Sequence, residues 1–425
     1  MTPLARRYAL LCALRWLPIG LILPVEVLLL QARGISIAAI GGLFAAYTAV
    51  VGVLELPTGG VDDRWGRRPV LVLSSALTLT GLVVMGVAAE VPALVGAMLL
   101  LAVGRALASG PLEAWFVDAA YAIDEHADVT PGLARGGFAE SAALAVGAIG
   151  GGVLPALASA LPEAGGDLLL SFSVTYLLAA AIVVLEIVAL VAIVRDPRRS
   201  SEALPASPSV AATVRAGVRL GARDVVVRRV LLRFFAVGFG VVGFELLVPV
   251  RLDDLLGDAT DTSAVYAVLL TAAFAGSAIG ASQAVRLRGR AQSAAKGALV
   301  ATIAGGVLGI ATGVPLLPVL AVGYIGAYFA TGPARPLLGE ILHARVGSAQ
   351  RATLLSVQSL AAMAGAVFGS LALPALADAT STGLALAVGG VVIVVGALPL
   401  IGLRSPSFVP APSPQGTSLE PHRAA

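Results

Sequence analysis

Charged residues inside long apolar runs are the part of this sequence that could do chemistry. Glu26, Glu113 and Glu245 lie within such runs, and so do Arg105 and Arg335. An unpaired charge in hydrocarbon costs at least a few kcal/mol, so such residues normally face a partner or a water-filled cavity. We expect these five residues to line a polar site in which a carboxylate takes up and releases a proton, or in which a charge binds a solute.

Two plainer interpretations of the same residues stay open. Glu26 lies about one turn from the end of its run, and Glu245 is placed similarly, so both side chains can reach toward water. Arg105 and Glu113 are separated by two helical turns and by about 80° around a continuous helix. They can neutralise neighbouring charges and hold helices together without any further role.

The runs that carry these charges are long enough to cross a membrane. The chain has 425 residues, of which 58% are hydrophobic and 12% charged, and its mean hydropathy is +0.94. A soluble domain cannot bury so much apolar surface, and a helix needs roughly 20 residues to cross a bilayer. We therefore expect an all-α membrane protein with twelve transmembrane helices. The expected spans are residues 8–30, 37–57, 70–89, 92–117, 137–160, 168–194, 230–250, 263–285, 297–313, 318–341, 352–377 and 383–403.

The distribution of basic residues predicts the orientation of these spans. Outside the spans, Arg33 and Arg251 are the only basic residues in the loops after odd-numbered spans. All others fall at the amino terminus, after even-numbered spans or in the carboxyl-terminal tail. Positive residues near span ends are retained in the cytoplasm, so we expect both termini to be cytoplasmic. The excess of arginine over lysine and the abundance of Ala and Gly suggest a GC-rich bacterial genome, and we therefore expect the protein in a bacterial inner membrane.

A short charged loop joins the second and third spans. A turn this short, with Gly beside its charges, fits two antiparallel helices that meet at one membrane face. Its marked positions are Gly59, Asp63, Arg64, Gly66, Arg67 and Arg68. This pattern resembles the signature between helices 2 and 3 of the major facilitator superfamily of transporters.

The resemblance implies a mechanism and a set of roles. It implies two six-helix bundles that rock about a central cavity lined by spans 1, 4, 7 and 10, which hold the five charged residues above and also Arg15 and Arg233. Arg105 is similar to the arginine of the family's span 4 motif. The loop is expected to act as a cytoplasmic gate, with Asp63 capping span 3 and Asp118 pairing with the arginines when that side is closed. The alternative is that these arginines only fix topology.

The two halves of the chain also repeat each other. Span 4 reads Ala108-Ser109-Gly110-Pro111, and span 10 reads Ala330-Thr331-Gly332-Pro333, which is 222 residues later. Asp118 and Glu340 follow their prolines at the same distance. Such a six-span unit, used twice in the same orientation, is the parallel repeat of major facilitator halves. Pro111 and Pro333 are expected to bend their helices, because proline removes a helical hydrogen bond.

The expected organisation of the chain has four parts. A first six-helix bundle covers residues 1–194, and a second covers 230–403. Between them, residues 195–229 form a cytoplasmic linker with a possible amphipathic helix, whose basic face suits an anionic leaflet. Residues 404–425 are rich in Pro, Ser and Ala and are expected to be a disordered tail.

The most specific functional prediction is proton-coupled efflux of small lipophilic or drug-like molecules. It rests on resemblance to drug/proton antiporters, which have acids in spans 1 and 4 and a glycine-rich span 5. Close packing is our preferred interpretation of those glycines. A proton-coupled importer and a non-transporting membrane sensor remain alternatives. We expect no enzyme, since catalytic triads and Walker-type loops are absent from the sequence. The single Cys12 and three scattered histidines argue against a metal or other cofactor. The expected partners are a small solute, protons and lipid, without nucleic acid, and the protein is expected to be a monomer.

Overall fold

The protein is an all-α membrane protein in the part of the chain that the computed structural model describes. That part comprises residues 2–58, 65–160, 168–195, 215, 219, 223–343, 345 and 348–403. Twelve helical segments in it are long and apolar enough to cross a membrane, and we number these spans 1 to 12. The predicted number of spans is therefore confirmed. Most of the predicted linker helix and all of the tail after Leu403 lie outside the described residues.

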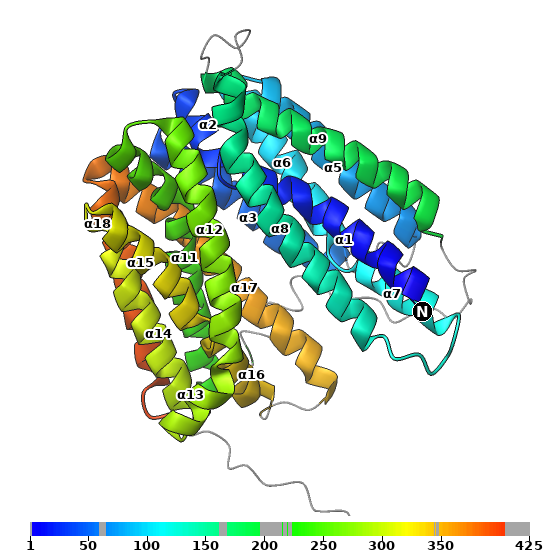
Figure 1. Cartoon of the computed structure of the whole chain (residues 1–425). Coiled ribbons are helices and arrows are strands. Elements are labelled where there is room, and N and C mark those ends of the chain that lie inside the picture. The colour runs from blue at the N-terminus through cyan, green and yellow to red at the C-terminus, as the bar shows by residue number, and fades with distance from the viewer. Residues whose placement is uncertain are drawn as a thin grey trace, which may run out of the picture.

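Spans 1 to 6 form the amino-terminal half, and spans 7 to 12 form the carboxyl-terminal half (Figure 1). The first half contains α1 (Thr2–Ile22), α2 (Glu26–Ala32), α3 (Ile37–Thr58), α5 (Arg67–Val87), α6 (Val91–Ala108), α7 (Pro111–Tyr121), α8 (Thr130–Ser159) and α9 (Leu168–Ile193). The second contains α11 (Val225–Leu256), α12 (Ala259–Ser282), α13 (Ala284–Ala291), α14 (Ala294–Ala311), α15 (Leu317–Thr331), α16 (Ala334–His343), α17 (Ser348–Ala379), α18 (Thr382–Ala397) and η2 (Leu398–Leu400). Span 7 thus begins at Val225, earlier than the sequence predicts.

Three of the twelve spans are broken rather than continuous. Span 4 is divided between α6 and α7, where Gly110 has a φ of 98° that favours glycine and Pro111 opens the next helix. Span 10 is divided between α15 and α16 around Pro333. The helices are interrupted at both prolines, where the sequence predicts bends. Span 1 is also divided, between α1 and α2 next to Pro24, and the sequence analysis did not predict that break.

Glycines set how closely the helices of each half approach. A Cβ atom at Gly151 of α8 would lie 1.9 Å from the Leu21 carbonyl oxygen of α1. In the other half, a Cβ atom at Gly365 of α17 would lie 1.9 Å from the Phe235 carbonyl oxygen of α11. Spans 1 and 5, and their counterparts 7 and 11, therefore cross backbone to backbone. This supports the interpretation of the span 5 glycines as packing residues.

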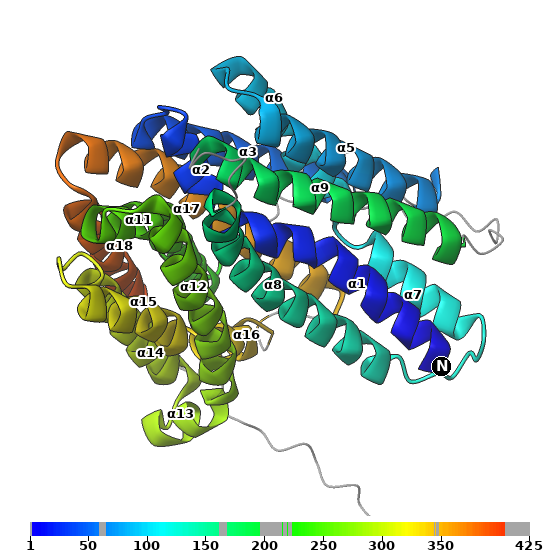
Figure 2. The same ribbon diagram turned by 45° about the horizontal axis from the view of Figure 1, so that its top comes forward.

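The two halves meet at one end of the molecule and separate toward the other. We call the end that holds Thr2 the terminal face and the opposite end the far face. Near the far face α3 packs against α17 and α8 against α12, and one hydrophobic core includes residues of both halves. Toward the terminal face the core divides into one cluster within each half. Figures 1 and 2 show the two bundles diverging in this direction.

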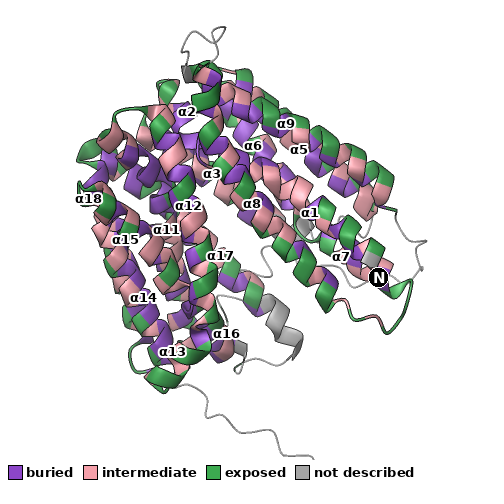
Figure 3. Ribbon diagram, in the orientation of Figure 1, coloured by how far each residue is buried: buried purple, intermediate pink, exposed green. Residues whose placement is uncertain are grey.

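The buried residues lie mainly inside the two bundles and at the junction between them (Figure 3). Figure 3 shows buried residues where the helices cross and exposed ones along the outer surfaces of the bundles. Many of the exposed side chains are large and apolar, such as Leu185 at 58% and Val188 at 61% exposed in α9. An apolar outer surface is the expected boundary with lipid. The exposed polar residues inside the spans are therefore the ones that need a functional explanation.

Candidate functional site

Two carboxylates from opposite halves lie near each other. Glu26 opens α2 directly after the break at Pro24, and it is 9% exposed. Glu245 lies in α11 and is exposed, although its neighbours Phe244 and Leu246 are buried. The two side chains are close enough to interact electrostatically, and α2 packs against α11. The structure thus brings two predicted site residues together at the junction of the halves.

A group of aromatic side chains lies beside Glu245. Tyr266 of α12 donates a hydrogen bond from its hydroxyl to the Glu245 carbonyl oxygen at 3.3 Å. Its ring centroid lies 6.3 Å from that of Tyr324 in α15, which is 5.2 Å from that of Tyr328. Phe274 of α12 contacts Tyr328 edge-on at 6.1 Å. We call Tyr266, Phe274, Tyr324 and Tyr328 the aromatic cluster.

The aromatic cluster has unused hydrogen-bonding capacity. The Tyr324 hydroxyl approaches those of Tyr266 and Tyr328. However, the hydroxyls of Tyr324 and Tyr328 complete no well-formed hydrogen bond with a described residue, although both are buried. A buried polar group without a partner is costly unless something satisfies it. This cluster is not predicted from the sequence, where its only signal is the i, i+4 spacing of Tyr324 and Tyr328 in span 10.

A second polar group lies in the amino-terminal half. The Arg105 guanidinium sits over the ring of Trp16, with its central carbon 4.6 Å from the ring centroid. Glu140 of α8 interacts electrostatically with both Arg105 and Glu113. Tyr47 of α3 interacts with Arg105 and also with Glu26. The side chain of Tyr47 therefore links the carboxylate pair electrostatically to the second polar group.

The predicted relation between Arg105 and Glu113 is wrong. It assumed one continuous helix, but the break at Gly110 places Arg105 in the last turn of α6 and Glu113 in the first turn of α7. Glu113 is exposed. Arg335, near the start of α16, is exposed too, and the ion pairs among described residues do not include one between it and Glu113.

Arg15 and Arg233 do not contribute to an exposed polar lining. Arg15 forms an ion pair with Glu186 of α9 at 2.9 Å, and these side chains are 9% and 5% exposed. Its guanidinium also donates to the Ala108 carbonyl oxygen at the end of α6, at 3.4 Å. Arg233 is buried and donates to the Thr302 hydroxyl at 3.2 Å. Both arginines thus link helices within one half.

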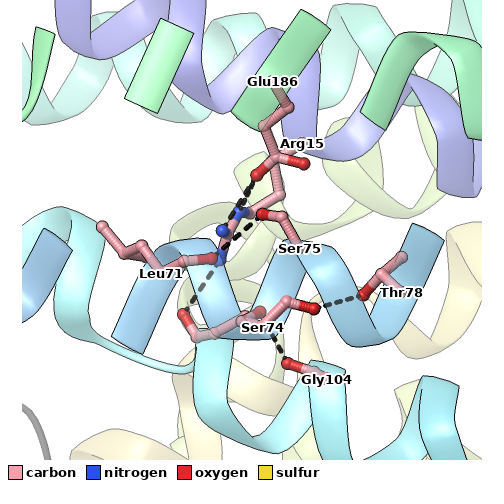
Figure 4. Close-up of polar contacts among 8 residues, drawn as sticks. Arg15, Leu71, Ser74, Ser75, Thr78, Gly104 and Glu186 are labelled. Carbon is pink, nitrogen blue, oxygen red and sulfur yellow. Dashed lines mark hydrogen bonds and ion pairs between the residues drawn. The ribbon is translucent and has the colours of Figure 1, made fainter. Parts of the chain in front are cut away.

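Figure 4 shows the surroundings of the Arg15–Glu186 pair. On α5 the Ser74 hydroxyl donates to the Gly104 carbonyl oxygen at 2.8 Å, which joins α5 to α6. The hydroxyls of Ser75 and Thr78 donate back to carbonyl oxygens of their own helix. Buried hydroxyl groups of this kind satisfy their donors locally. The ion pair therefore lies among buried residues and gives Glu186 a structural role in the first half.

The signature loop is described only from Trp65 onward. Gly66 precedes α5 with a φ of 91°, and no side chain caps that helix start among the described residues. Arg67 forms an ion pair with Asp118 of α7, the partner that the family resemblance implied. Gly59, Asp63 and Arg64 lie outside the described residues, so the proposed cap by Asp63 stays a prediction.

The position of the Arg67 ion pair bears on the predicted gate. Arg67 and Asp118 belong to the same half, and their pair exists although the halves diverge at the terminal face. The pair is therefore compatible with separated halves at the terminal face, and its part in a cytoplasmic gate stays a prediction. The second half has a matching pair, Arg288 with Glu340, at 3.0 Å. Since Glu340 follows Asp118 by 222 residues, the contact is repeated between the halves.

Comparisons with known proteins agree with the twelve-span fold described above. The model of the Major Facilitator Superfamily matches residues 8–308, whereas comparison with curated proteins found no match. The chain is similar to the nucleoside transporter NupG, with a TM-score of 0.74 and 11% identity over 93% of this chain and 98% of that one.

Two further solved structures share the fold. A bacterial homologue of the human lysosomal transporter Spinster, in an inward-facing and unoccupied conformation, has a TM-score of 0.70 and 16% identity, with 94% of each chain covered. A POT family transporter in complex with a thioalcohol-conjugated peptide has a TM-score of 0.67 and 13% identity, over 93% of this chain and 94% of that one. Identities this low show a common fold and leave the substrate open.

Proposed function

Since the chain belongs to the major facilitator superfamily, whose model matches residues 8–308, it is a secondary transporter, and we propose that it exchanges protons for small lipophilic cations. The proposed direction is efflux. The observation that carries this proposal is the pairing of Glu26 with Glu245 across the two halves. Both acids lie in spans that surround the junction, one at the start of α2 and one within α11.

The carboxylate pair favours exchange of one positive charge for another. Two ionised carboxylates near each other repel, and neither one forms an ion pair with a described arginine or lysine. A bound proton relieves this repulsion, and so does a bound cation. Because the proton and the cation neutralise the same negative charge, they compete for binding to the carboxylate pair. Competition of this kind couples the movement of protons to that of a cationic solute.

The aromatic cluster favours organic cations among the possible solutes. Aromatic rings attract cations to their faces, most strongly where water is excluded. Tyr266 and Tyr324 are buried, whereas Tyr328 and Phe274 are partly exposed beside Glu245. The hydroxyls of Tyr324 and Tyr328, which complete no well-formed hydrogen bond within the described part of the chain, can accept hydrogen bonds from a polar group of the ligand. A lipophilic cation therefore fits both the charge and the surroundings of Glu245.

The mechanism we propose is rocking of the two halves about their junction. The separation of the halves at the terminal face, together with cytoplasmic termini from the positive-inside pattern, corresponds to a conformation open to the cytoplasm. We place the protein in a bacterial inner membrane as a monomer. Glu113, Arg105 and Arg335 would then line the route from the cytoplasm, and Glu140 and Tyr47 extend that set toward Glu26.

Purified protein in liposomes that contain a pH-sensitive dye provides the test. Tetraphenylphosphonium and tetraphenylborate have nearly the same size and opposite charges, and protein-free vesicles give the passive background. We expect the cation to drive proton movement through the wild type. We expect Glu26→Gln and Glu245→Gln each to reduce this movement at least about tenfold, which corresponds to about 1.4 kcal/mol. Glu90→Gln, at an exposed loop position, is the matched control.

Three results would argue against the proposal. Equal proton movement with the anion would exclude selection for cations. Full exchange by both glutamine variants would remove the carboxylate pair from the mechanism. Accumulation rather than loss of a fluorescent cation in cells that express the protein would favour the importer.

A further inference from the structure

One carboxylate joins the two halves at the far face. Asp378, near the end of α17, accepts a hydrogen bond from the backbone N–H of Ala38 at 2.8 Å. Ala38 is the second residue of α3, so the carboxylate sits at the amino-terminal end of a helix from the opposite half. The first N–H groups of a helix have no partner within it, and the helix dipole favours a negative charge there. The contact therefore has both a hydrogen-bonding and an electrostatic component.

The internal repeat shows that an acidic cap supplied by the opposite half occurs at the start of span 2, whereas span 8 is capped differently. Ser36 caps α3 from within its own chain segment, with its hydroxyl 3.2 Å from the Ala39 nitrogen. The corresponding residue 222 positions later is Asp258, whose carboxylate accepts from Thr260 and Asp261 at the start of α12. Span 8 thus carries its own acidic cap. Span 2 receives its acid from the other half, which makes that cap depend on contact between the halves.

The second junction at the far face uses a different contact. The Ser263 hydroxyl of α12 donates to the Gly152 carbonyl oxygen of α8 at 3.0 Å. The same hydroxyl also donates to the Thr260 carbonyl oxygen of its own helix. A Cβ atom at Gly152 would lie 2.6 Å from the Ser263 carbonyl oxygen. This junction is held by close packing and a shared neutral hydrogen bond. The only charged link between the halves among these contacts is that of Asp378.

We propose that Asp378 is a latch that keeps the far face closed by capping α3 of the opposite half. When the far face opens, α3 and α17 must separate at this end, and the Ala38 N–H and the Asp378 carboxylate then return to water. The latch thus biases the equilibrium between the two conformations of the transporter. The proposed latch affects only the equilibrium between these two conformations. It therefore does not depend on which solute or ion the protein carries.

The chain itself indicates how to remove each side of the latch separately. Asp378→Asn removes the charge and keeps the shape. Ala38→Pro removes the N–H donor without changing any charge. Proline is acceptable in the first turn of a helix, and this chain has it at the second position of other helices, for example Pro92 of α6, Pro131 of α8 and Pro318 of α15. Asp254→Asn is the matched control, since Asp254 is exposed and pairs with Arg251 of its own helix.

The measurement is a distance between spin labels across the far face, in full-length protein reconstituted in lipid nanodiscs. Cys12→Ala removes the one native cysteine. Labels at Ala160 of the first half and Val314 of the second report the separation of the halves. We expect Asp378→Asn to increase the population with the longer distance about fivefold to tenfold, the effect of one exposed charge-assisted cap. Asp378→Glu should retain the wild-type distribution.

A double-mutant cycle distinguishes the latch from a general loss of stability. Ala38→Pro should produce the same shift as Asp378→Asn, and the double variant should add little to either. A second label pair, at Tyr121 and Arg290 on the terminal face, should report the reciprocal approach of the halves. The proposal is overturned if Asp378→Asn leaves the far-face distances unchanged, if Asp254→Asn shifts them equally, or if the two effects simply add.

Discussion

The buried ion pair between Arg15 and Glu186 leads to a quantitative prediction about stability. Its side chains are 9% and 5% exposed, and the guanidinium contacts Glu186 through two nitrogens at 2.9 Å. Replacement of Glu186 by glutamine leaves the arginine charge buried with its main partner lost. Removal of one partner of a buried pair typically costs about 3–5 kcal/mol. Since the glutamine side chain would keep one acceptor oxygen, we expect a loss at the lower end of that range, about 3 kcal/mol.

The same reasoning predicts that removal of both charges is far less damaging. Arg15→Met combined with Glu186→Leu replaces the pair by apolar side chains, and such replacements are often neutral or stabilising. The Arg15 contact with the Ala108 carbonyl oxygen is also lost, which we expect to cost about 1 kcal/mol. The double variant should therefore be clearly more stable than Glu186→Gln alone.

Unfolding in mixed micelles of increasing SDS fraction measures these differences. The three tryptophans of the chain provide the signal, and Trp16 is next to Arg15 in the sequence. Glu340→Gln is the matched control, because Glu340 pairs with Arg288 where the side chains are 38% and 40% exposed. We expect this exposed pair to contribute less than about 1 kcal/mol. The reasoning fails if Glu186→Gln costs no more than Glu340→Gln, or if the double variant is as unstable as the single one.

Two other properties can be predicted from local geometry. Gly151→Val should destabilise the protein by about 1–3 kcal/mol through overpacking against α1. Gly150→Ala should be tolerated, because a Cβ atom there would have its nearest neighbour at 3.4 Å. Equal melting temperatures of the two variants in detergent would contradict this prediction. Hydrogen bonds from Thr260 and Asp261 hold the pKa of Asp258 below its ordinary value. Its stabilisation of α12 is therefore complete above pH about 3.9 and lost as the pH falls through the lower folded-state pKa. Asp258→Asn should weaken the acid sensitivity of the far face, measured by hydrogen exchange, and an unchanged pH profile would refute the role of this cap.

Much of the fold could be predicted from the sequence, because a membrane restricts a chain strongly. The bilayer fixes the length of each span, and unsatisfied backbone groups in hydrocarbon leave the helix as the available structure. Prolines beside glycine marked the breaks in spans 4 and 10. Pro24 in span 1 has no glycine next to it in the sequence, and Pro18, which lies within the continuous helix α1, shows that proline alone does not predict a break.

The partners of the charged residues could be predicted only in part. Arg67 and Asp118 were paired correctly because family resemblance placed them at the same face. Arg15 and Glu186 are 171 positions apart, and helical periodicity does not determine which neighbouring helix each face meets. Charge alone suggested that Arg15 belongs to an exposed polar site, whereas packing against α9 places it in the interior of one half. The aromatic cluster was missed for the same reason, since its members come from two spans.

The two halves repeat their packing, but they differ in the chemistry of their interior. The crossing of α1 with α8 at Gly151 recurs as the crossing of α11 with α17 at Gly365. The charged groups do not recur in this way. Arg105 and Glu140 interact in the first half, whereas the second half places the aromatic cluster next to Glu245. Packing must be equivalent in both halves if they are to rock about a common junction, while binding a solute and handling a proton need different side chains. This division is consistent with the proposed exchange, in which Glu26 and Glu245 stand where the two sets of residues meet.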